Sequence, residues 1–350
     1  MSWTLAPAAD VDAWAARWDA LQRDCAASPL LAADFVQPLV AHFGAGAELV
    51  ASFERGGRIE AMTVVAPLGR AAWATFQPAQ APVGLWLQRR GMERAALAAA
   101  LLQRLPGYPL ILGLLESDPA LDPRPPEGGR VRTLDYIDTA RITLAGSFDD
   151  YWSRRGKNLR ANLKKQRARL LKEGVATRLE VCRDPRQVAQ AVADYGRLEG
   201  AGWKGREGTA VTQDNDQGRF YRAMLENFCA RGAGSIYRYW FDETLVATDL
   251  CIEDGAQIVI LKTAYDETVD SGLSPALLMR EEQCRQLFDE ARLARIEFYG
   301  RVMEWHTRWT DEVRTLYHVN CYRWPALARL HAHLQARCSA APAAATNQTE

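Results

Sequence analysis

The sequence predicts an α/β protein that contains two copies of one order of helices and strands. Runs rich in β-branched residues alternate with amphipathic stretches along the chain of 350 residues, a length that favours two domains. Each half is expected to contain two helices, three strands, a helix and a strand in that order. This order indicates two tandem domains, each with a mixed, mostly antiparallel and twisted sheet flanked by helices.

Glycine, proline and apolar periodicity set the limits of the elements expected in the first half. Gly56 and Gly57 indicate a hairpin turn, and Leu97, Leu101 and Leu105 lie on one face of a helix. The expected elements are helices at 11–25, 33–43 and 92–105 and strands at 48–54, 58–67, 71–76, 108–115 and 133–144. A surface loop rich in proline and glycine is expected before the last strand, and the first domain is expected to span residues 1–145.

A long basic helix at 147–173 is expected to open the second domain. Ser147 and Asp150 have the spacing of a capping box, and Gly174 suits the helix end. The basic side chains on its exposed face are Arg154, Arg155, Lys157, Arg160, Lys164, Lys165, Arg167, Arg169 and Lys172. This face could bind RNA, flank a channel for donor phosphates or an acidic glycan, or be a solvated surface whose counter-charges lie on other elements.

The centre of the second domain is expected to be a strand pair followed by a helix. Strands at 244–253 and 256–266 are rich in β-branched residues, and Ser274 and Pro275 suit the N-cap and first position of a helix. Free N–H groups at such a helix start can bind an anion. The other expected elements are strands at 178–182, 235–241, 295–299 and 313–322, a helix opening at 184 and a helix at 217–230. The second domain is expected at 146–337 and a disordered tail at 338–350.

The composition is that of a cytoplasmic protein and excludes several functional classes. The 43 basic residues balance the 43 acidic residues, which argues against a chain that coats nucleic acid or an anionic membrane. The seven cysteines form no Cys-x-x-Cys pair and are expected to be buried and reduced. We expect no secretory signal, membrane span, metal ligand set or dinucleotide fingerprint.

Four segments resemble the GNAT acyltransferase superfamily when they are taken with this order of elements. They are Glu199–Gly205, Leu261–Asp266, Leu273–Pro275 and Glu304–Trp309. The similarity is narrower to the BioF2-like or CelD-like (cellulose-biosynthesis-associated) branch, which is related to the FemABX transferases. The family pattern often has Gly where this chain has Ala276, and Lys where it has His306.

The resemblance implies that the donor is acyl-CoA, most simply acetyl-CoA, bound as a co-substrate rather than as a permanent cofactor. The residues expected to hold it are Thr263, Ala264, Ser271, Gly272, Leu273, Ser274, Pro275 and Ala276. Strand amides would hold the pantetheine, and the loop with the helix start would hold the pyrophosphate.

Acyl transfer needs a base for the nucleophile and an acid for the leaving thiolate. His306 is the expected base, although it could instead be held between Trp305 and Trp309 without moving a proton. Tyr265 or Tyr299 could protonate the thiolate or could simply pack at strand ends.

Further charged and aromatic residues are expected at the site. Lys262 interrupts an apolar strand, so it either faces solvent or enters a site that needs charge, and Asp249 in the neighbouring strand is its expected partner. Trp203 and Lys204 lie in a glycine-rich loop that could cover the acceptor or merely pack. Trp305 and Trp309 are also expected to contact the substrate.

The function expected from these residues is transfer of an acyl group from CoA to an amine or hydroxyl. The resemblance extends the possible acceptors to a small molecule, a polysaccharide or a cell-envelope precursor. One alternative is a FemABX-like transferase that uses aminoacyl-tRNA, which the basic helix would bind. Another alternative is a GNAT fold without catalysis that assists exopolysaccharide assembly, for which Ala276 and His306 are the supporting positions.

Overall fold

The computed structural model describes residues 2–25, 28–201 and 211–340, and side chains as far as residue 333. The first half contains β1 (Ser2–Pro7), α1 (Ala15–Cys25), α2 (Ala33–Phe43), β2 (Leu49–Arg55), β3 (Arg58–Pro67), β4 (Ala72–Thr75), β5 (Trp86–Gln88), α3 (Arg94–Arg104), β6 (Ile111–Ser117) and β7 (Val131–Thr143). The sequence-based expectation missed β1, which gains its stability by pairing with β2, and the three-residue β5, which is short and pairs with β3.

The second half confirms the expected order of elements. It contains α4 (Phe148–Ser153), α5 (Lys157–Lys172), β8 (Thr177–Cys182), α6 (Val188–Ala201), α8 (Asp216–Ala230), β9 (Gly234–Phe241), β10 (Thr244–Glu253), β11 (Gln257–Tyr265), α9 (Pro275–Glu290), β12 (Arg295–Phe298), α10 (Glu304–Thr307), β13 (Val313–Tyr322) and α11 (Pro325–Ala340). Helix α11 was not expected and includes residues 338–340 of the expected tail; residues 341–350 lie outside the described residues.

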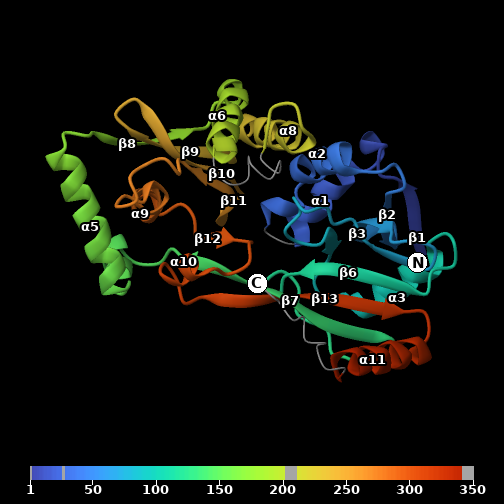
Figure 1. The fold of residues 1–350 in the computed structure, drawn as a ribbon. Helices are drawn as coiled ribbons and strands as arrows, with labels where there is room; N and C mark the ends of the chain where they lie inside the picture. The colour runs from blue at the N-terminus through green and yellow to red at the C-terminus, as the bar shows by residue number, and fades with distance from the viewer. Residues whose placement is uncertain (1, 26–27, 202–210, 341–350) are drawn as a thin grey trace, which may run out of the picture.

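All these strands form one mixed sheet that runs through both halves (Figure 1). Its order is β1-β2-β3-β4-β6-β13-β7-β12-β11-β10-β9-β8, with β5 paired to β3. Each half contains one parallel pair, β4 with β6 and β11 with β12; the connection contains β5 and α3 in the first half and α9 in the second. The two halves therefore share one architecture, as the element order predicted.

The halves exchange their last strands at the centre of the sheet. Strand β13 of the second half pairs with β6, and β7 of the first half pairs with β12, while β7 and β13 pair with each other. Arg323, just after β13, donates to the carbonyls of Leu102 and Pro109 in the first half. The proposed boundary at residues 145 and 146 therefore separates two segments of chain that complete each other's part of the sheet.

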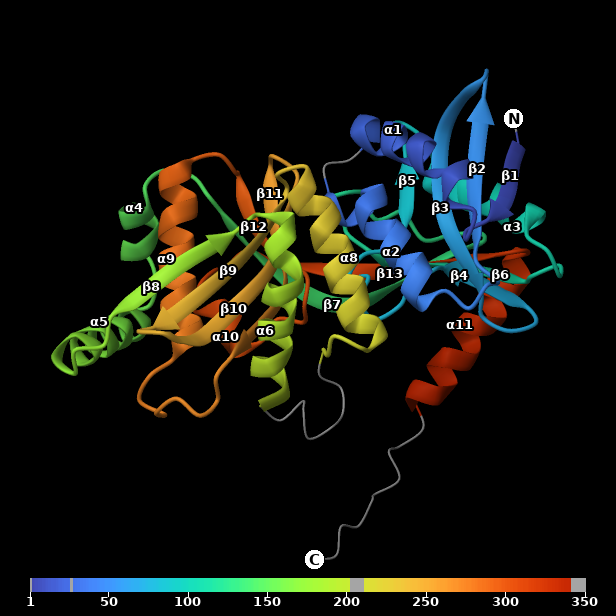
Figure 2. The same cartoon turned by 90° about the horizontal axis from the view of Figure 1, so that it is seen from above.

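Helices cover both faces of the sheet. Helices α1, α2, α6 and α8 lie on one face (Figure 1), where a single hydrophobic core contains residues from all four helices. The edge-on contact of Phe35 with Phe220 joins α2 to α8, with ring centroids 5.6 Å apart, and Figure 2 shows these two helices side by side. On the other face, α3 covers the first half, and α4, α5 and α9 cover the second half over separate cores. The two halves are thus packed together through one face.

The expected long basic helix is two helices. Ser147 accepts the Asp150 N–H as an N-cap, as predicted, but α4 ends at Ser153 and α5 begins at Lys157. Gly156 is the residue before α5, with φ −52° and ψ 135°, an extended conformation that interrupts the helical hydrogen bonds. The apolar seam continues across this break, because Phe148 and Tyr151 of α4 and Leu159 and Leu163 of α5 belong to the same core.

Candidate functional site

A gap opens between β11 and β12 near the middle of the second half. Their parallel pairing extends only from Gln257 to Val259 on β11 and from Arg295 to Glu297 on β12. Beyond these residues the strands separate around a cavity of about 720 Å³. We call this the strand-gap cavity; it is lined by Ile260, Leu261, Lys262, Thr263, Tyr265, Asp266, Glu267, Val269, Ser271, Leu273, Ser274, Pro275, Ala276, Leu277, Arg280, Phe298, Gly300, Trp305, His306 and Trp309.

A β-bulge in β11 decides which side chains face the two sides of the sheet. Leu250 on β10 is opposite Lys262, but the next residue, Cys251, is opposite Ile260. Leu261 is therefore an extra residue, and the alternation of faces shifts by one after it. As a result Lys262 turns toward α6 and α8, where its ammonium lies 3.9 Å from Glu199 and 5.8 Å from the ring centre of Tyr221.

The predicted pairing of Lys262 with Asp249 is wrong. Asp249 is opposite Thr263, whose hydroxyl donates to the Asp249 carboxylate at 2.6 Å on the other face of the sheet. There Asp249 forms an ion pair of 2.7 Å with Arg280 of α9, and the two side chains are 0% and 3% exposed. The bulge is the physical reason, because without it Lys262 would face α9.

Arg280 was missed by the sequence analysis and is the buried cation of the strand-gap cavity. It also contacts Gln283 and lies 5.4 Å from the centre of the Phe298 ring. A sequence signal was available, since Arg280 follows Leu278 and Met279 on the buried side of α9, where a charge needs a partner.

His306 lines the same cavity as a neutral imidazole. Its Nδ1 accepts the Met303 N–H at 2.9 Å, and its ring stacks on Trp305 with 3.6 Å between centroids. Burial, and then the nearby charge of Arg280, lowers the pKa of His306 to about 4. A neutral ring whose Nδ1 accepts a hydrogen bond carries its proton on Nε2. His306 in this state offers a proton rather than a lone pair, so the geometry does not support the prediction of a general base.

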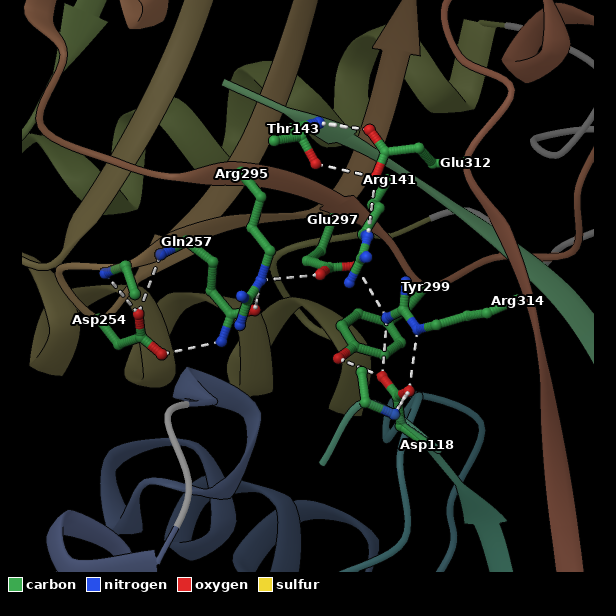
Figure 3. Close-up of polar contacts among 12 residues, drawn as sticks. Asp118, Arg141, Thr143, Asp254, Gln257, Arg295, Glu297, Tyr299, Glu312 and Arg314 are labelled. Atoms are coloured by element: carbon green, nitrogen blue, oxygen red, sulfur yellow. Dashed lines mark hydrogen bonds and ion pairs between the residues drawn. The ribbon is translucent and has the colours of Figure 1, made fainter. Parts of the chain in front are cut away.

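The two candidate tyrosines have different surroundings. Tyr265 is half-exposed and lines the strand-gap cavity. Tyr299 is buried, and its hydroxyl donates to Asp118 of the first half at 2.8 Å, as Figure 3 shows. Burial and the adjacent carboxylate raise the pKa of Tyr299 well above its ordinary value. The predicted role of Tyr299 as the acid for the thiolate is therefore not supported, and only Tyr265 is placed for it.

Figure 3 also shows what holds Tyr299 in place at the centre of the sheet. Arg314 of β13 bridges Asp118 and Glu297 at 2.7 and 2.8 Å. Arg295 adds an ion pair of 3.1 Å with Glu297. These contacts join β6, β12 and β13, so the end of β12 beside the gap is fixed by both halves.

The loop before α9 is bound to α5. The Ser274 N–H donates to the side chain of Gln166 at 2.8 Å, and the Gly272 N–H donates to Asp270 at 2.7 Å. Asp270 is in turn paired with Arg169 at 2.9 Å. The Leu273 N–H also donates to the Asp270 carbonyl at 2.8 Å. Three of the amides expected to bind a pyrophosphate therefore have protein partners, whereas Ala276 lies in the first helical turn, where the helix itself offers no acceptor.

The remaining predicted binding residues divide into three groups. Ser271, Leu273, Ser274, Pro275 and Ala276 line the strand-gap cavity, as do Thr263, Trp305 and Trp309. Ala264 is not at the cavity, because its side chain points into the core on the opposite face. Gly272 faces Arg169 instead. Trp203 and Lys204 lie outside the described residues.

The comparisons with known proteins agree with this geometry. Residues 157–309 match the family Acetyltransf_6, described as an acetyltransferase (GNAT) domain. The match starts at α5 and ends at Trp309, so it includes both strands of the gap, α9 and His306. This part of the chain is a GNAT-fold acyltransferase domain. No curated protein matches the sequence.

Solved structures share the fold of nearly the whole chain at low identity. The C-terminal domain (DUF2156) of a putative lysylphosphatidylglycerol synthetase from Agrobacterium fabrum is 13% identical with a TM-score of 0.53, covering 91% of this chain and 96% of that one. L-PGS from Bacillus licheniformis is 14% identical with a TM-score of 0.53, covering 91% and 96%. FemX is 9% identical with a TM-score of 0.55, covering 90% and 97%. The expected GNAT fold is confirmed, and FemX is among the proteins that share the fold.

Two further properties of the described residues bear on the chemistry. They contain no group of three or more His, Cys, Asp or Glu side chains arranged to hold a metal ion. None of their helices combines the length and the apolar character that a membrane crossing requires.

Proposed function

We propose that this protein transfers an acyl group from a CoA thioester to an amine or hydroxyl, with the thioester held in the strand-gap cavity. The observation that carries the proposal is the separation of β11 from β12 beside the first turn of α9. A separated strand offers backbone N–H and C=O groups that no neighbouring strand satisfies, and an extended amide chain such as pantetheine can pair with them.

The apolar and cationic parts of the cavity suit the two ends of such a donor. Leu273, Leu277 and Phe298 provide an apolar lining for the pantetheine and the acyl chain. The amide of Ala276 and the dipole of the 16-residue helix α9 favour a phosphate at the loop. Asp270 opposes a phosphate, but Arg169 neutralises it at 2.9 Å.

Charge that develops during acyl transfer would meet two donors in the cavity. The Nε2–H of His306 can donate to an oxyanion or to the leaving thiolate, and the guanidinium of Arg280, whose charge Asp249 balances, is the second N–H donor at the cavity. Tyr265 is the further proton donor at the cavity. In this proposal His306 remains neutral during turnover at pH 7, because its pKa of about 4 keeps the ring unprotonated.

Isothermal titration with acetyl-CoA and a longer acyl-CoA tests the donor. The variant Ala276→Glu places a carboxylate in the first turn of α9, where it suits the helix dipole but repels a phosphate. We expect wild-type protein to bind at micromolar concentration and the variant to lose at least about tenfold in affinity, the effect of about 1.4 kcal/mol of repulsion.

The matched control is Ala96→Glu, an exposed position in the first turn of α3, the corresponding helix of the first half. This variant adds the same charge at a distance from the cavity and should bind like wild type. Equal loss in both variants would indicate a general charge effect, and absence of binding to wild type would overturn the proposal.

A second candidate is transfer from aminoacyl-tRNA, which the basic surface of α5 favours. Arg167 is paired with Glu281 and Glu282, and Arg169 with Asp270 and Glu173. The helix lysines Lys157, Lys164, Lys165 and Lys172, in contrast, have no ion-pair partner among the residues that the structure describes. Free lysines on one helix suit a polyanion, and FemX and a lysylphosphatidylglycerol synthetase share the fold.

Charge reversal at Lys164 and Lys165 distinguishes the two candidates. If the donor is aminoacyl-tRNA, tRNA binding should weaken steeply with salt and fall further in the double Glu variant. If the donor is acyl-CoA, the same variant should bind acetyl-CoA like wild type, because neither lysine lines the strand-gap cavity.

A further inference from the structure

We propose that two copies of this chain associate through the free edge of β8, so that their sheets continue into one another across a two-fold axis. Strand β8 is the last strand of the sheet and pairs only with β9 among the described residues; Figure 1 shows it at the outer border of the second half. No residue of β8 is among the described lining of the strand-gap cavity. The inference is therefore independent of the proposed function.

Three residues of β8 point their backbone groups away from β9. The Ala176 carbonyl, just before β8, accepts the Asp242 N–H at 2.8 Å, so Ala176 faces β9. The backbone groups of successive residues alternate in direction along an antiparallel pair, and the register of β8 with β9 is continuous. The N–H and C=O groups of Thr177, Leu179 and Val181 therefore point outward. No other strand of the described structure pairs with them.

The edge of β8 lacks the protection that the opposite edge of the sheet has. At the opposite edge the Ala8 N–H donates to the Glu48 carbonyl at 2.9 Å, so Ala8 faces β2. By the same alternation, the outward residues of β1 are Trp3, Leu5 and Pro7. Pro7 has no N–H, and a proline at such a position hinders pairing with a further strand. Strand β8 contains no proline, lysine or bulge, so it can accept a strand along its whole length.

The charges on β8 are self-complementary in one register. Arg178 and Glu180 lie on one face of the strand, where their side chains form an ion pair of 2.9 Å and are 53% and 32% exposed. When two copies of β8 pair antiparallel about Leu179, Arg178 of each copy lies opposite Glu180 of the other. A two-fold axis at Arg178 or at Glu180 would instead place like charges directly opposite each other, which is destabilising. The charges therefore favour the register centred on Leu179.

The same register uses every outward backbone group of β8. Leu179 exchanges hydrogen bonds with Leu179 of the other copy, and Thr177 of each copy exchanges them with Val181 of the other. The dimer is closed, because the same edge of both copies is used and no β8 edge is left free. Charge and backbone pattern thus indicate one arrangement, which a second copy of β8 fits better than a strand of unrelated sequence.

The side chains on both faces of β8 suit this pairing. Leu179 and Val181 turn to the face covered by α5 and α9, where they are half-buried against its core. In the dimer the two Leu179 side chains lie opposite each other, and such cross-strand apolar pairs stabilise a sheet. On the other face the Trp240 indole N–H donates to Glu180 at 2.9 Å, and Arg238 lies 3.4 Å from the same carboxylate. Glu180 is thus oriented before the two copies meet.

Sedimentation velocity of the full-length protein over a range of concentrations measures the association. We expect a species of twice the chain mass of 39.0 kDa, whose fraction rises with concentration. Leu179→Pro removes the outward N–H at the axis and should raise the Kd of the dimer at least about tenfold. The matched control is Leu5→Pro, which makes the same change at an outward position of β1 and should leave the Kd unchanged.

Charge reversal tests the register. Arg178→Glu and Glu180→Arg each place like charges opposite each other at two positions of the dimer, so each should raise the Kd at least about tenfold. An equimolar mixture of the two variants should associate again, because every charge then lies opposite one of the other sign. The double variant Arg178→Glu with Glu180→Arg should dimerise like wild type for the same reason.

Three outcomes overturn the inference. They are a monomeric wild type, a dimer that Leu179→Pro leaves intact, and a dimer that neither single charge variant weakens. A monomeric wild type would leave the edge of β8 to a strand of another protein. None of these outcomes bears on the proposed function, because acetyl-CoA binding should be the same in all the variants, whose positions do not line the strand-gap cavity.

Discussion

The two halves contain the same parallel strand pair, but in the part of the chain that the structure describes only the second half opens a cavity between its strands. In the first half β4 pairs with β6 from Ala72 to Ala74, just as β11 pairs with β12 from Gln257 to Val259. Beyond the first pair, Thr75 accepts the Leu115 N–H at 2.9 Å, and the Gly84 N–H donates to the Glu116 carbonyl at 3.0 Å. The first half therefore satisfies with its own chain the groups that, in the proposed function, the second half leaves to the acyl donor.

We call the hydrogen bond from the Gly84 N–H to the Glu116 carbonyl the bridge of the first half. The absence of a side chain at Gly84 makes this bridge possible. A Cβ at Gly84 would lie 2.1 Å from the Leu115 carbonyl oxygen, so no other residue fits between the strands. A cavity of about 800 Å³ does lie beside the bridge, near the start of α3, but no residue of β4 is among its described lining. The same topology therefore does not by itself open a cavity between the strands; the chain that lies beyond the paired residues decides whether one forms.

The largest effect is expected at the attachment of the helix that lies between the two strands of each parallel pair in the chain. Helix α9 is joined to the sheet by the buried ion pair of Asp249 and Arg280, whereas α3 uses apolar residues such as Leu101. Asp249→Ala leaves Arg280 buried without its partner and should cost about 3–5 kcal/mol in the free energy of unfolding, measured by urea denaturation.

The control for this difference is the double variant Asp249→Leu with Arg280→Met. Replacing a buried ion pair by apolar side chains is often neutral, so stability should return close to that of wild type. Leu101→Ala in α3 should cost about 2–5 kcal/mol by loss of packing alone. If the double variant is as unstable as Asp249→Ala, the ion pair contributes a net stabilisation that exceeds the free-energy cost of burying its two charges.

The second effect concerns the histidine beside each strand pair and its response to pH. His306 accepts the Met303 N–H and His318 accepts the Glu116 N–H, and burial lowers the pKa of both. Between pH 6.5 and about 4 the unfolded chain binds a proton at His306 that the native protein does not, so stability falls as pH falls through this window.

The variant His306→Asn isolates this contribution. Wild type should lose up to about 3 kcal/mol more than the variant between pH 7 and pH 4, measured by denaturation at each pH. His318 titrates in the same direction and is present in both proteins, so it cancels in the difference. Parallel stability curves for the two proteins would show that the His306 pKa is not lowered.

The third effect tests the bridge in the first half. Gly84→Ala forces the Leu115 carbonyl to move and should cost about 1–3 kcal/mol by overpacking. Acyl-CoA binding should be unchanged, because Gly84 does not line the strand-gap cavity. Gly156→Ala, where an added Cβ meets no atom within 4 Å, is the control and should cost less than about 1 kcal/mol. If Gly84→Ala leaves the free energy of unfolding unchanged, the Leu115 carbonyl moves without a cost in stability.

The smallest effect is expected at the carboxyl group of the bridge. Glu116 accepts hydrogen bonds from Gln77 and Tyr136, and burial raises its pKa. Tyr136→Phe removes one of these bonds and should cost about 0.5–1.5 kcal/mol in stability, with no change in acyl-CoA binding. A loss of acyl-CoA binding in this variant would indicate that the first half takes part in donor recognition. This result would contradict the proposed difference between the two halves.

The sequence by itself determined the kind and order of most elements. Local signals predicted several of them, and the structure contains each at the expected place. They are the strands at the β-branched runs 244–253 and 256–266, the helix cap of Ser147 with Asp150, and the start of α9 at Pro275. The two segments Leu273–Pro275 and Glu304–Trp309, on which the resemblance rested, both contribute residues to the lining of the strand-gap cavity.

Only the tertiary structure decided how these elements combine. The exchange of β7 and β13 joins residues nearly 200 positions apart, as in the contact of Asp118 with Arg314, and no periodicity reports such pairing. The bulge at Leu261 reversed the expected partner of Lys262, because one extra residue in a strand turns every later side chain to the other face. The proton on His306 likewise depends on the backbone N–H of Met303, which only the folded chain brings to its Nδ1.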